Sequence, residues 1–386
     1  MLYTRRCLCL RISYALFIPA FLYFVIFLKR QRPQLEQNSQ RTPDSLEHES
    51  YPIYEYTSLY RIRADSEFEK SLDQKLISLE KSKRASVSEN LVANYTIWQI
   101  ASSKEKKTWE AWVSQWDNAN PEWTHYVLTS LPDDLLEAFQ SIPDIRDAMK
   151  KYPLIQKDLL RHLLLWYHGG LYAGIDTWSR VSLRECAPIA SVINNSMNIG
   201  LMIGVGIDEP FLSLKWMEKW GWTRNFGFSQ DLIWAPRKYD PILRYAIIRS
   251  ISHARIQQEL GGFADLSNVQ KRQILEEISG VAMFTDVVLE NLSDQLSMDD
   301  TLRDPDAGIA RRVSWKNIRR LKSPIWIEAD YAAKDDSISG LAILPIYVWS
   351  NGQAHSNAGS DSVEGACVNQ IHSLSHEKYW RDYNLN

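Results

Sequence analysis

Two residue types are distributed unevenly along the chain, and this limits where a packed core can form. All 15 Trp lie at or after Trp98, and all 16 Gly lie at or after Gly169. Trp buries a large apolar area in protein cores, and Gly supplies conformations that tight turns require. We therefore expect the globular fold to occupy residues 93–386, preceded by a segment of a different kind.

The composition of the whole chain excludes several classes of protein. Of its 386 residues, 45% are hydrophobic and 24% are charged, which are ordinary values for a globular protein. Collagen-like, wholly disordered and multi-spanning membrane chains are excluded on these values. Lys and Arg total 44 against 47 Asp and Glu, and the resulting net charge of −3 argues against a nucleic-acid-binding protein.

A run of 17 uncharged residues, Ile12–Leu28, lies near the N-terminus. As a helix it would span about 25 Å, slightly less than the ~30 Å hydrocarbon core of a bilayer. A cleaved signal peptide is the alternative, but no small-residue cleavage site follows, and the run ends directly on Lys29-Arg30. We therefore predict a cytosolic tail at 1–11 and a retained transmembrane signal anchor at 12–28.

The next segment, residues 29–92, is polar and free of Trp and Gly, and we expect it to be a stalk. The apolar spacing from Phe68 to Leu79 predicts a charged surface helix over Ser66–Lys83. A disordered tether with an incidental helix is the alternative.

The four cysteines form two groups. Cys7 and Cys9 lie just before the anchor, where a thiol could be acylated. Cys186 and Cys367 could pair in an oxidising lumen, or could equally be two buried free thiols. Three Asn-x-Ser/Thr sequons agree with lumenal exposure, and they begin at Asn94, Asn194 and Asn291.

Strand-like and helix-like segments alternate after residue 93. The strand candidates are Tyr95–Ile100, Trp123–Leu128, Leu171–Ile175, Asn198–Gly206 and Leu341–Trp349. Between them, helical spacing is strongest over Leu154–Tyr167, and Trp109, Trp112 and Trp116 are spaced as one buried helix stripe. The alternation predicts an α/β fold with a Rossmann-like first half, in which ligands lie beyond the carboxyl ends of the strands.

The stretch from Lys157 to Arg180 carries the residues best suited to chemistry. Asp158 and Arg161 are three residues apart and share one face of the predicted helix. A Gly-Gly turn and a short strand then bring Asp176 towards that face. One acidic residue beside an Asp/Arg pair suits a divalent cation, a diphosphate and a sugar hydroxyl. On spacing alone, an ordinary surface ion pair and a turn aspartate explain these residues slightly better.

The pattern D-x-x-R-x-x-x-L-x-x-x-G-G-x-Y-x-x-x-D resembles the sugar-binding DXD region of glycosyltransferase family 32, most closely the fungal outer-chain α-1,6-mannosyltransferases. Its residues here are Asp158, Arg161, Leu165, Gly169, Gly170, Tyr172 and Asp176. Further segments similar to the family lie at Thr96–Gln99, Ser229–Leu243, Ser279–Asp286 and Leu344-Pro345. The resemblance covers roughly residues 94–376.

This resemblance implies a GT-A type fold, a nucleotide-sugar donor, a divalent cation such as Mn²⁺ and retaining transfer. It also implies a single-pass type II Golgi membrane enzyme with a lumenal catalytic domain. The expected reaction moves mannose from GDP-mannose to a glycan acceptor in protein N-glycosylation, with a mannosyltransferase complex as the implied protein partner. An inositol-phosphoceramide or another glycan is the alternative acceptor.

The resemblance also assigns roles to individual residues. Asp158 and Arg161 match positions that contact the donor's sugar and diphosphate, and Tyr172 lies beside them. Asp176 matches the second Asp of the DXD motif, which binds the metal and phosphate oxygens. Gly174 stands where the family has the first Asp, so the predicted cation site has lost one oxygen ligand of the kind that Mn²⁺ prefers.

Two further sets of residues are weaker candidates. Gln230 and Asp231 are the only candidates for a catalytic nucleophile, because they open the segment similar to the family's Gln-containing motif. Three tryptophans outside a clean helical stripe could stack on an acceptor sugar, with core packing as the alternative; they are Trp216, Trp220 and Trp222.

The glycine at position 174 leaves a second class of function open. A membrane-anchored relative could keep the fold and act as a non-catalytic binding or assembly partner. Gly174 favours this reading, and the complete set of Asp158, Arg161 and Asp176 opposes it. His372 or His376 could rejoin the metal shell, although a solvated histidine is the simpler expectation.

Overall fold

The computed structural model describes residues 58–86, 95–195, 197–210, 212, 216–217, 220–307, 311–329, 339–353 and 355–370. These residues lie in the second of two compact units, Ile53–Asn386; the first unit, Met1–Pro52, lies outside them. The predictions for the anchor at 12–28 and for Cys7, Cys9, Asn94, His372 and His376 therefore fall outside the described residues. Within the described ranges, no helix combines the length and the apolar character needed to cross a membrane.

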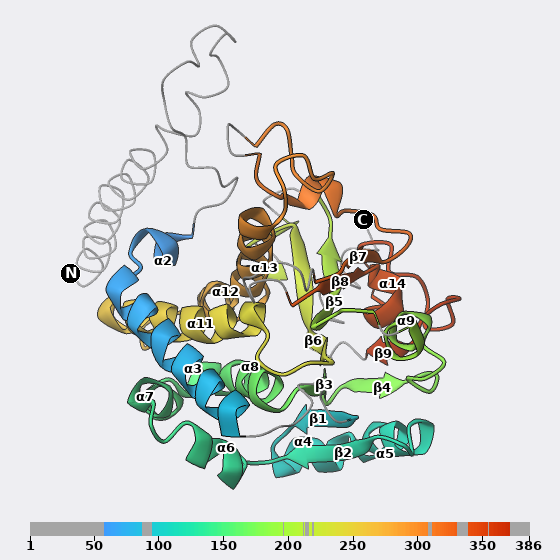
Figure 1. The fold of residues 1–386 in the computed structure, drawn as a ribbon, viewed down its shortest axis with the longest axis horizontal. Coiled ribbons are helices and arrows are strands. Elements are labelled where there is room, and N and C mark those ends of the chain that lie inside the picture. Colours follow the sequence, from blue (N-terminus) through green and yellow to red (C-terminus); the bar gives the residue numbers. More distant parts are fainter. Residues whose placement is uncertain are drawn as a thin grey trace, which may run out of the picture. The chain divides into compact units, whose positions relative to one another are not determined.

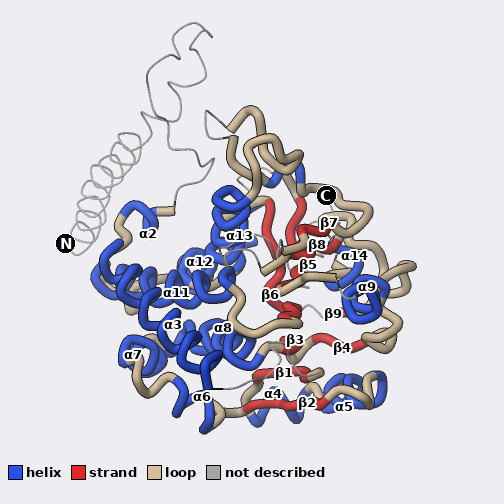
Figure 2. Tube along the Cα trace, in the orientation of Figure 1, coloured by secondary structure: helices blue, strands red, loops and turns tan. Residues whose placement is uncertain are grey.

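A seven-stranded mixed sheet forms the centre of the fold, in the order β2-β1-β3-β6-β5-β8-β7 (Figures 1 and 2). Its strands are β1 (Thr96–Ile100), β2 (Thr124–Leu128), β3 (Gly170–Ala173), β5 (Leu201–Asp208), β6 (Phe226–Ala235), β7 (Ile325–Ile327) and β8 (Leu341–Leu344). β1 runs parallel to β2 and β3, whereas β6 is antiparallel to both β3 and β5. The α/β prediction is confirmed, with a mixed sheet at its centre.

A second, two-stranded sheet pairs β4 (Thr177–Ser179) with β9 (Val368–Gln370) in antiparallel fashion. The longer helices are α3 (Ser66–Ser86), α5 (Glu110–Ala119), α7 (Pro143–Lys151), α8 (Gln156–His168), α9 (Ala187–Asn195), α11 (Pro241–Glu259), α12 (Asn268–Ile278) and α13 (Val281–Gln295). The shorter ones are α2 (Leu59–Ile62), α4 (Ser103–Thr108), α6 (Asp133–Ala138), η3 (Pro153–Ile155), η4 (Trp315–Asn317) and α14 (Ile346–Trp349).

Side chains that alternate along the strands belong to two separate apolar clusters, one on each face of the sheet. Trp98, Tyr172 and Ile203 belong to the larger cluster, which includes side chains of α3, α8, α11 and α13. Their neighbours Ile97 and Leu171 belong to the other cluster, with side chains of α5, α9 and α14. This alternation is the two-residue period of a strand buried on both faces. Figure 1 shows α11 and α13 on one side of the sheet and α9 and α14 on the other.

The stalk prediction is wrong for α3. Leu72 and Leu76 are fully buried in the larger cluster, and α3 packs against α11. Arg244 of α11 also binds Asp73 at 2.8 Å between its Nε and the carboxylate Oδ1. The helix was predicted correctly, but its apolar stripe is a docking face. The compact unit therefore begins before residue 93, and its boundary lies at Ile53.

Two other element predictions need correction. The predicted strand Leu341–Trp349 ends at Leu344, because Pro345 lacks the N–H that would continue the ladder and instead precedes α14. The predicted tryptophan stripe is also broken. Trp116 is fully buried, but Trp109 is the N-cap of α5 and packs half-exposed against Trp112, with ring centres 5.3 Å apart.

Candidate functional site

A cavity of about 260 Å³ lies beside the segment that follows β3. Its polar lining comes from parts of the chain that are far apart in sequence, and it includes Asp176, Trp222, Thr223, Arg224, Ser229, Asp231, Glu276, Gln353, His355 and Gln370. Asp176 was expected beyond the carboxyl end of its strand, where α/β sheets bind ligands. The cavity occupies that position.

The Gly-Gly turn between α8 and β3 is required by close backbone packing. Gly169 and Gly170 both have positive φ, at 70° and 95°. A Cβ on Gly170 would lie 2.7 Å from the carbonyl oxygen of Thr96 on β1. The indole Nε1 of Trp98 donates to the Gly169 carbonyl at 2.9 Å. A side chain at 170 would therefore push β3 away from β1, and only glycine allows the chain to reverse there.

The loop after β3 is held by hydrogen bonds to the Gly174 backbone. Its carbonyl accepts from the Gln99 amide Nε2 at 2.9 Å and from the Thr177 hydroxyl at 2.6 Å. Its N–H donates to the Asp231 carbonyl on β6 at 2.7 Å. Gln99 is in turn within 3.1 Å of the ring Nε2 of His125 on β2. Three strands thus fix the loop that presents Asp176.

The predicted donor-binding residues Asp158 and Arg161, in the N-terminal half of α8, come together with Tyr172 of β3. Arg161 lies 3.3 Å from the Asp158 carboxylate, and its guanidinium carbon is 4.5 Å from the Tyr172 ring centre. Arg161 also donates from Nη1 to the Gln230 amide oxygen at 3.1 Å. The Ser279 hydroxyl donates to Asp158 at 2.7 Å. Arg161 is only 8% exposed, so this is a buried polar cluster and not the surface ion pair that was the alternative.

The carboxyl groups in and beside this cluster are buried close to one another, and this raises their pKa values. Burial raises the pKa of Asp158. Burial, and then the charge of Asp231, raises the pKa of Asp176 to about 7. The pKa of Glu276 is also raised to about 7, by burial and then by Asp158. Burial opposes the charge of Arg161, but Tyr172 and Asp158 favour it and raise its pKa overall.

Gln370 of β9 binds one of the carboxylates that line the cavity. Its amide Nε2 donates to Asp231 Oδ2 at 2.9 Å, and Gln370 lines the same cavity as Asp176. β9 is tied down by a disulfide between Cys186 and Cys367, whose Cα atoms are 5.4 Å apart. The two cysteines are therefore paired, which decides between the alternatives that their spacing left open.

The three acceptor candidates lie in one aromatic group with different exposures. Trp222 lines the cavity, and its ring centre is 4.8 Å from that of His355. Trp220 is only 3% exposed, and Trp216 packs against it with ring centres 5.8 Å apart. Trp222 is therefore placed to meet a bound molecule, whereas Trp220 supports it from behind.

Several cavity residues were not found by sequence reasoning. Glu276 and His355 stand in no recognisable pattern, because their neighbours in space come from distant parts of the chain. Arg224 also lines the cavity, and its salt bridge to Asp286 at 2.8 Å joins it to a segment that resembles the family. Gln370 lies outside the segments in which that resemblance was recognised, so no motif gave a signal for it.

The asparagines of two sequons lie within the described part of the chain. Asn194 is exposed on α9. Asn291 is only 8% exposed and lies inside α13, so the folded surface offers little room for a glycan there.

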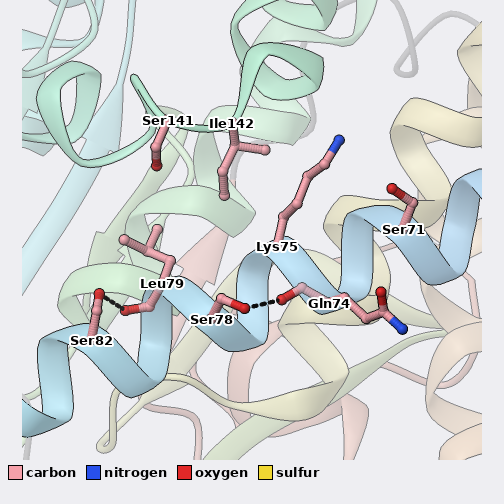
Figure 3. A pocket seen from close by; sticks show the side chains of 8 residues that line it. All are labelled: Ser71, Gln74, Lys75, Ser78, Leu79, Ser82, Ser141 and Ile142. Atoms are coloured by element: carbon pink, nitrogen blue, oxygen red, sulfur yellow. Dashed lines mark hydrogen bonds between the residues drawn. The ribbon is translucent and has the colours of Figure 1, made fainter.

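A second cavity, of about 460 Å³, runs along α3 beside the turn before α7 (Figure 3). It is lined by Ser71, Gln74, Lys75, Ser78, Leu79, Ser82, Ser141 and Ile142. The hydroxyls of Ser78 and Ser82 donate back to carbonyls of their own helix, each at 2.7 Å. Lys75 binds Asp144 at 2.8 Å. This lining carries no acid or base group that is free for chemistry, so the first cavity is the functional candidate.

Comparison with known proteins agrees with the geometry. The family described as "Glycosyltransferase sugar-binding region containing DXD motif" matches residues 102–196, which include Asp158, Arg161 and Asp176. The chain is 25% identical over 244 residues to the "Initiation-specific alpha-1,6-mannosyltransferase" of Candida albicans, covering 60% of each chain. It is 28% identical over 241 residues to the "Putative glycosyltransferase HOC1" of Saccharomyces cerevisiae, covering 59% of this chain and 54% of that one.

Among solved structures, the chain is similar to "PaToxG Glycosyltransferase" at 15% identity, covering 58% of this chain and 80% of that chain. The TM-score is 0.30, too low to support an inference. The two curated relatives are matched over only 60% and 54% of their own lengths. The family match itself falls on α8, the Gly-Gly turn and the loop that presents Asp176. Residues 102–196 of this chain are therefore similar to the sugar-binding region of the DXD-motif glycosyltransferases.

Proposed function

We propose that this protein is a glycosyltransferase that binds a nucleotide sugar and a divalent cation beside Asp158, Arg161 and Asp176. The observation that carries the proposal is their convergence. Residues from α8 and from the loop after β3 meet Gln230 and Asp231 of β6 next to one cavity. Arg161 is the group best suited to the diphosphate, because its planar guanidinium offers several donors to phosphate oxygens.

The residues present fit a divalent cation. Asp176, Asp231 and Glu276 all line the cavity, and the buried Arg161 already faces Asp158. A diphosphate would bring further negative charge into this acidic surrounding, and a divalent cation would offset it. Carboxylate oxygens are the ligands that Mg²⁺ and Mn²⁺ prefer. Across the described ranges no group of three or more His, Cys, Asp or Glu is placed to hold a metal, so donor phosphates and water would complete the shell.

The chain's own residues would share the work of transfer. Arg161 binds the diphosphate, Asp158 accepts a hydrogen bond from a donor sugar hydroxyl, and Tyr172 keeps Arg161 in place by packing under it. A bound cation would stabilise the negative charge of the departing diphosphate. In a retaining transfer, the acceptor hydroxyl approaches the anomeric carbon from the side that the diphosphate leaves. Trp222, at the cavity wall, is positioned to stack on the acceptor sugar.

The finer proposal is an α-1,6-mannosyltransferase-like enzyme of GT-A type that uses GDP-mannose, Mn²⁺ and a glycan acceptor. It is supported by the similarity to the Candida albicans relative, whose name contains this activity. An inositol-phosphoceramide or another glycan is the alternative acceptor. We further propose a Golgi location, a type II anchor at 12–28 and a mannosyltransferase complex as partner. The Cys186–Cys367 disulfide supports the lumenal part of this proposal, because disulfides persist in oxidising compartments.

A screen of nucleotide sugars against the purified full-length chain tests the enzyme proposal. The chain should release nucleoside diphosphate from one donor, GDP-mannose, in the presence of Mn²⁺ and a mannan-type acceptor. Asp176→Asn should reduce this rate at least a hundredfold. Asp133→Asn, an exposed carboxylate in the first turn of α6, should leave the rate unchanged and serves as the matched control. Turnover that persists in Asp176→Asn would contradict the proposal.

Gly174 supports a second candidate, a non-catalytic member that binds the donor without transferring it. The same screen separates the two. If the chain binds GDP-mannose but releases no GDP with any acceptor, it is the non-catalytic form. Turnover would exclude that form.

A further inference from the structure

The position of the missing DXD carboxylate can be located in the sheet. β3 and β6 pair in antiparallel register, with Ala173 opposite Leu232. Just beyond this pair, the Gly174 N–H donates to the Asp231 carbonyl at 2.7 Å, so the two residues are neighbours across the strand pair. Asp231 and Asp176 also line the same cavity. Asp231 thus supplies a carboxylate close to the position where the DXD motif has its first aspartate.

Asp176 occupies the space beside Gly174. A Cβ built on Gly174 would lie 2.9 Å from Asp176 Oδ1. The Asp176 carboxylate therefore occupies space that is free only because residue 174 has no side chain. Asp231 and Asp176 line the same cavity, one from β6 and one from the loop after β3. The lost carboxylate at 174 and the carboxylate at 231 are therefore alternatives for the same region of the site.

A neutral donor binds Asp231 beside Asp176. The Gln370 amide donates to Asp231 Oδ2 at 2.9 Å, and Gln370 lines the same cavity as both carboxylates. An amide can orient Asp231 without carrying a positive charge of its own, so the carboxylate remains available to a cation. Arg161 pairs with Asp158, and Arg224 of the cavity wall pairs with Asp286. Two carboxylates that line one cavity in this way are matched to a small hard cation.

We propose that Asp231 is the second carboxylate ligand of the donor's divalent cation, replacing across the strand pair the aspartate that is absent at position 174. The inference rests on the proposed function and reassigns Asp231, which the sequence suggested as a nucleophile. Gln370 is a positioning residue in this scheme, because it acts through Asp231. The site then offers a carboxylate pair, as a complete DXD motif would, built from a strand and a loop instead of one loop.

The two roles for Asp231 predict different results for Asp231→Asn. If Asp231 is a cation ligand, the substitution should weaken Mn²⁺ binding at least tenfold in the presence of GDP. Asp231→Glu keeps the charge and should lose less affinity than Asp231→Asn. If Asp231 is only a nucleophile, Asp231→Asn should bind Mn²⁺ as the unchanged protein does and should lose turnover alone. The Gln370 amide can still donate to an asparagine oxygen, so we expect the variant to fold.

Free Mn²⁺ can be counted directly by electron paramagnetic resonance while the full-length chain and GDP are titrated. The unchanged protein, Asp231→Asn, Asp176→Asn and the double variant are compared, with Asp133→Asn as the control. We expect each single variant to lose at least tenfold in affinity and the double variant to lose less than the product of the two. Far-UV circular dichroism confirms that each variant is folded.

Asp231→Asn with Mn²⁺ affinity within twofold of the unchanged protein would overturn the inference. In that case the proposed function stands, because the unchanged protein still binds Mn²⁺ and GDP and depends on Asp176. Absence of any GDP-dependent Mn²⁺ binding in the unchanged protein would instead overturn the proposed function, and the inference with it. The two failures are therefore distinguishable in one data set.

Discussion

The charges of Asp158, Arg161 and Asp176 are tolerated in the protein interior only because of the groups that surround them. Arg161 is buried, yet it is held in place by Asp158, Gln230 and the ring of Tyr172. A buried charge is tolerated only when it is paired and hydrogen-bonded. Removing one partner leaves the rest of the cluster uncompensated, so single substitutions here should affect both folding and binding.

At the scale of one residue, Gly174→Ala should weaken cation binding. Its Cβ would lie 2.9 Å from Asp176 Oδ1 and would displace that carboxylate, at a cost of about 1 kcal/mol or more. Gly204→Ala is the matched control, because its Cβ would meet Trp349 at an ordinary 3.6 Å. Mn²⁺ titration in the presence of GDP checks both variants. Equal affinity in Gly174→Ala and the unchanged protein would show that Asp176 does not need this space.

At the scale of elements, the short sheet of β4 and β9 closes the site. β4 begins directly after Asp176, and β9 carries Gln370. The Cys186–Cys367 disulfide lies at the start of β9 and links it to the N-terminus of α9. Neither strand is long enough to be stable alone, so the covalent link contributes both to stability and to the position of Gln370.

Replacing both Cys186 and Cys367 by Ser should lower the free energy of unfolding and the cation affinity together. Their sequence separation of 181 predicts a loss of roughly 2–5 kcal/mol, because the cross-link restricts the unfolded chain. Chemical denaturation measures the first effect, and Mn²⁺ titration measures the second. Loss of stability with unchanged Mn²⁺ affinity would mean that β9 does not position Gln370 through this link.

At the scale of the whole molecule, the buried titratable groups predict how stability depends on pH. Burial lowers the pKa of His162 and His253 to about 3, so these groups reduce stability below the ordinary histidine pKa of about 6.5. The pKa values of Asp176 and Glu276 are raised to about 7. The folded protein therefore retains protons that the unfolded chain has already released, and stability falls as pH rises through 7.

Without divalent cations, the free energy of unfolding should therefore decrease as pH rises from 6.5 through about 7 and should level off towards pH 8, once both carboxyl groups have lost their protons in the folded protein. Glu276→Gln should flatten this decline, because the substituted side chain does not titrate. Urea unfolding at pH 6.5, 7.2 and 8.0 in the presence of a chelator measures the slope. A free energy that rises from pH 6.5 to 8 would contradict the assignment of raised carboxylate pKa values.

Features that follow from local sequence patterns could be predicted from the sequence, whereas features that depend on distant parts of the chain could not. Helix α8, its Gly-Gly stop and strand β3 were predicted because each follows from a local pattern. Strand β6 was not recognised as a strand, and the docking of α3 onto α11 was missed, because both depend on partners distant in sequence. For the same reason the sequence singled out the cluster of Asp158, Arg161 and Tyr172, while it gave no signal for Gln370 and Glu276.

The most direct test of the account is calorimetric binding of GDP-mannose to the full-length chain with and without Mn²⁺. We expect Mn²⁺ to tighten binding at least tenfold in the unchanged protein and to have no effect when Asp176 and Asp231 are both replaced by Asn. Equal affinity with and without Mn²⁺ in the unchanged protein, or no binding at all, would contradict the account.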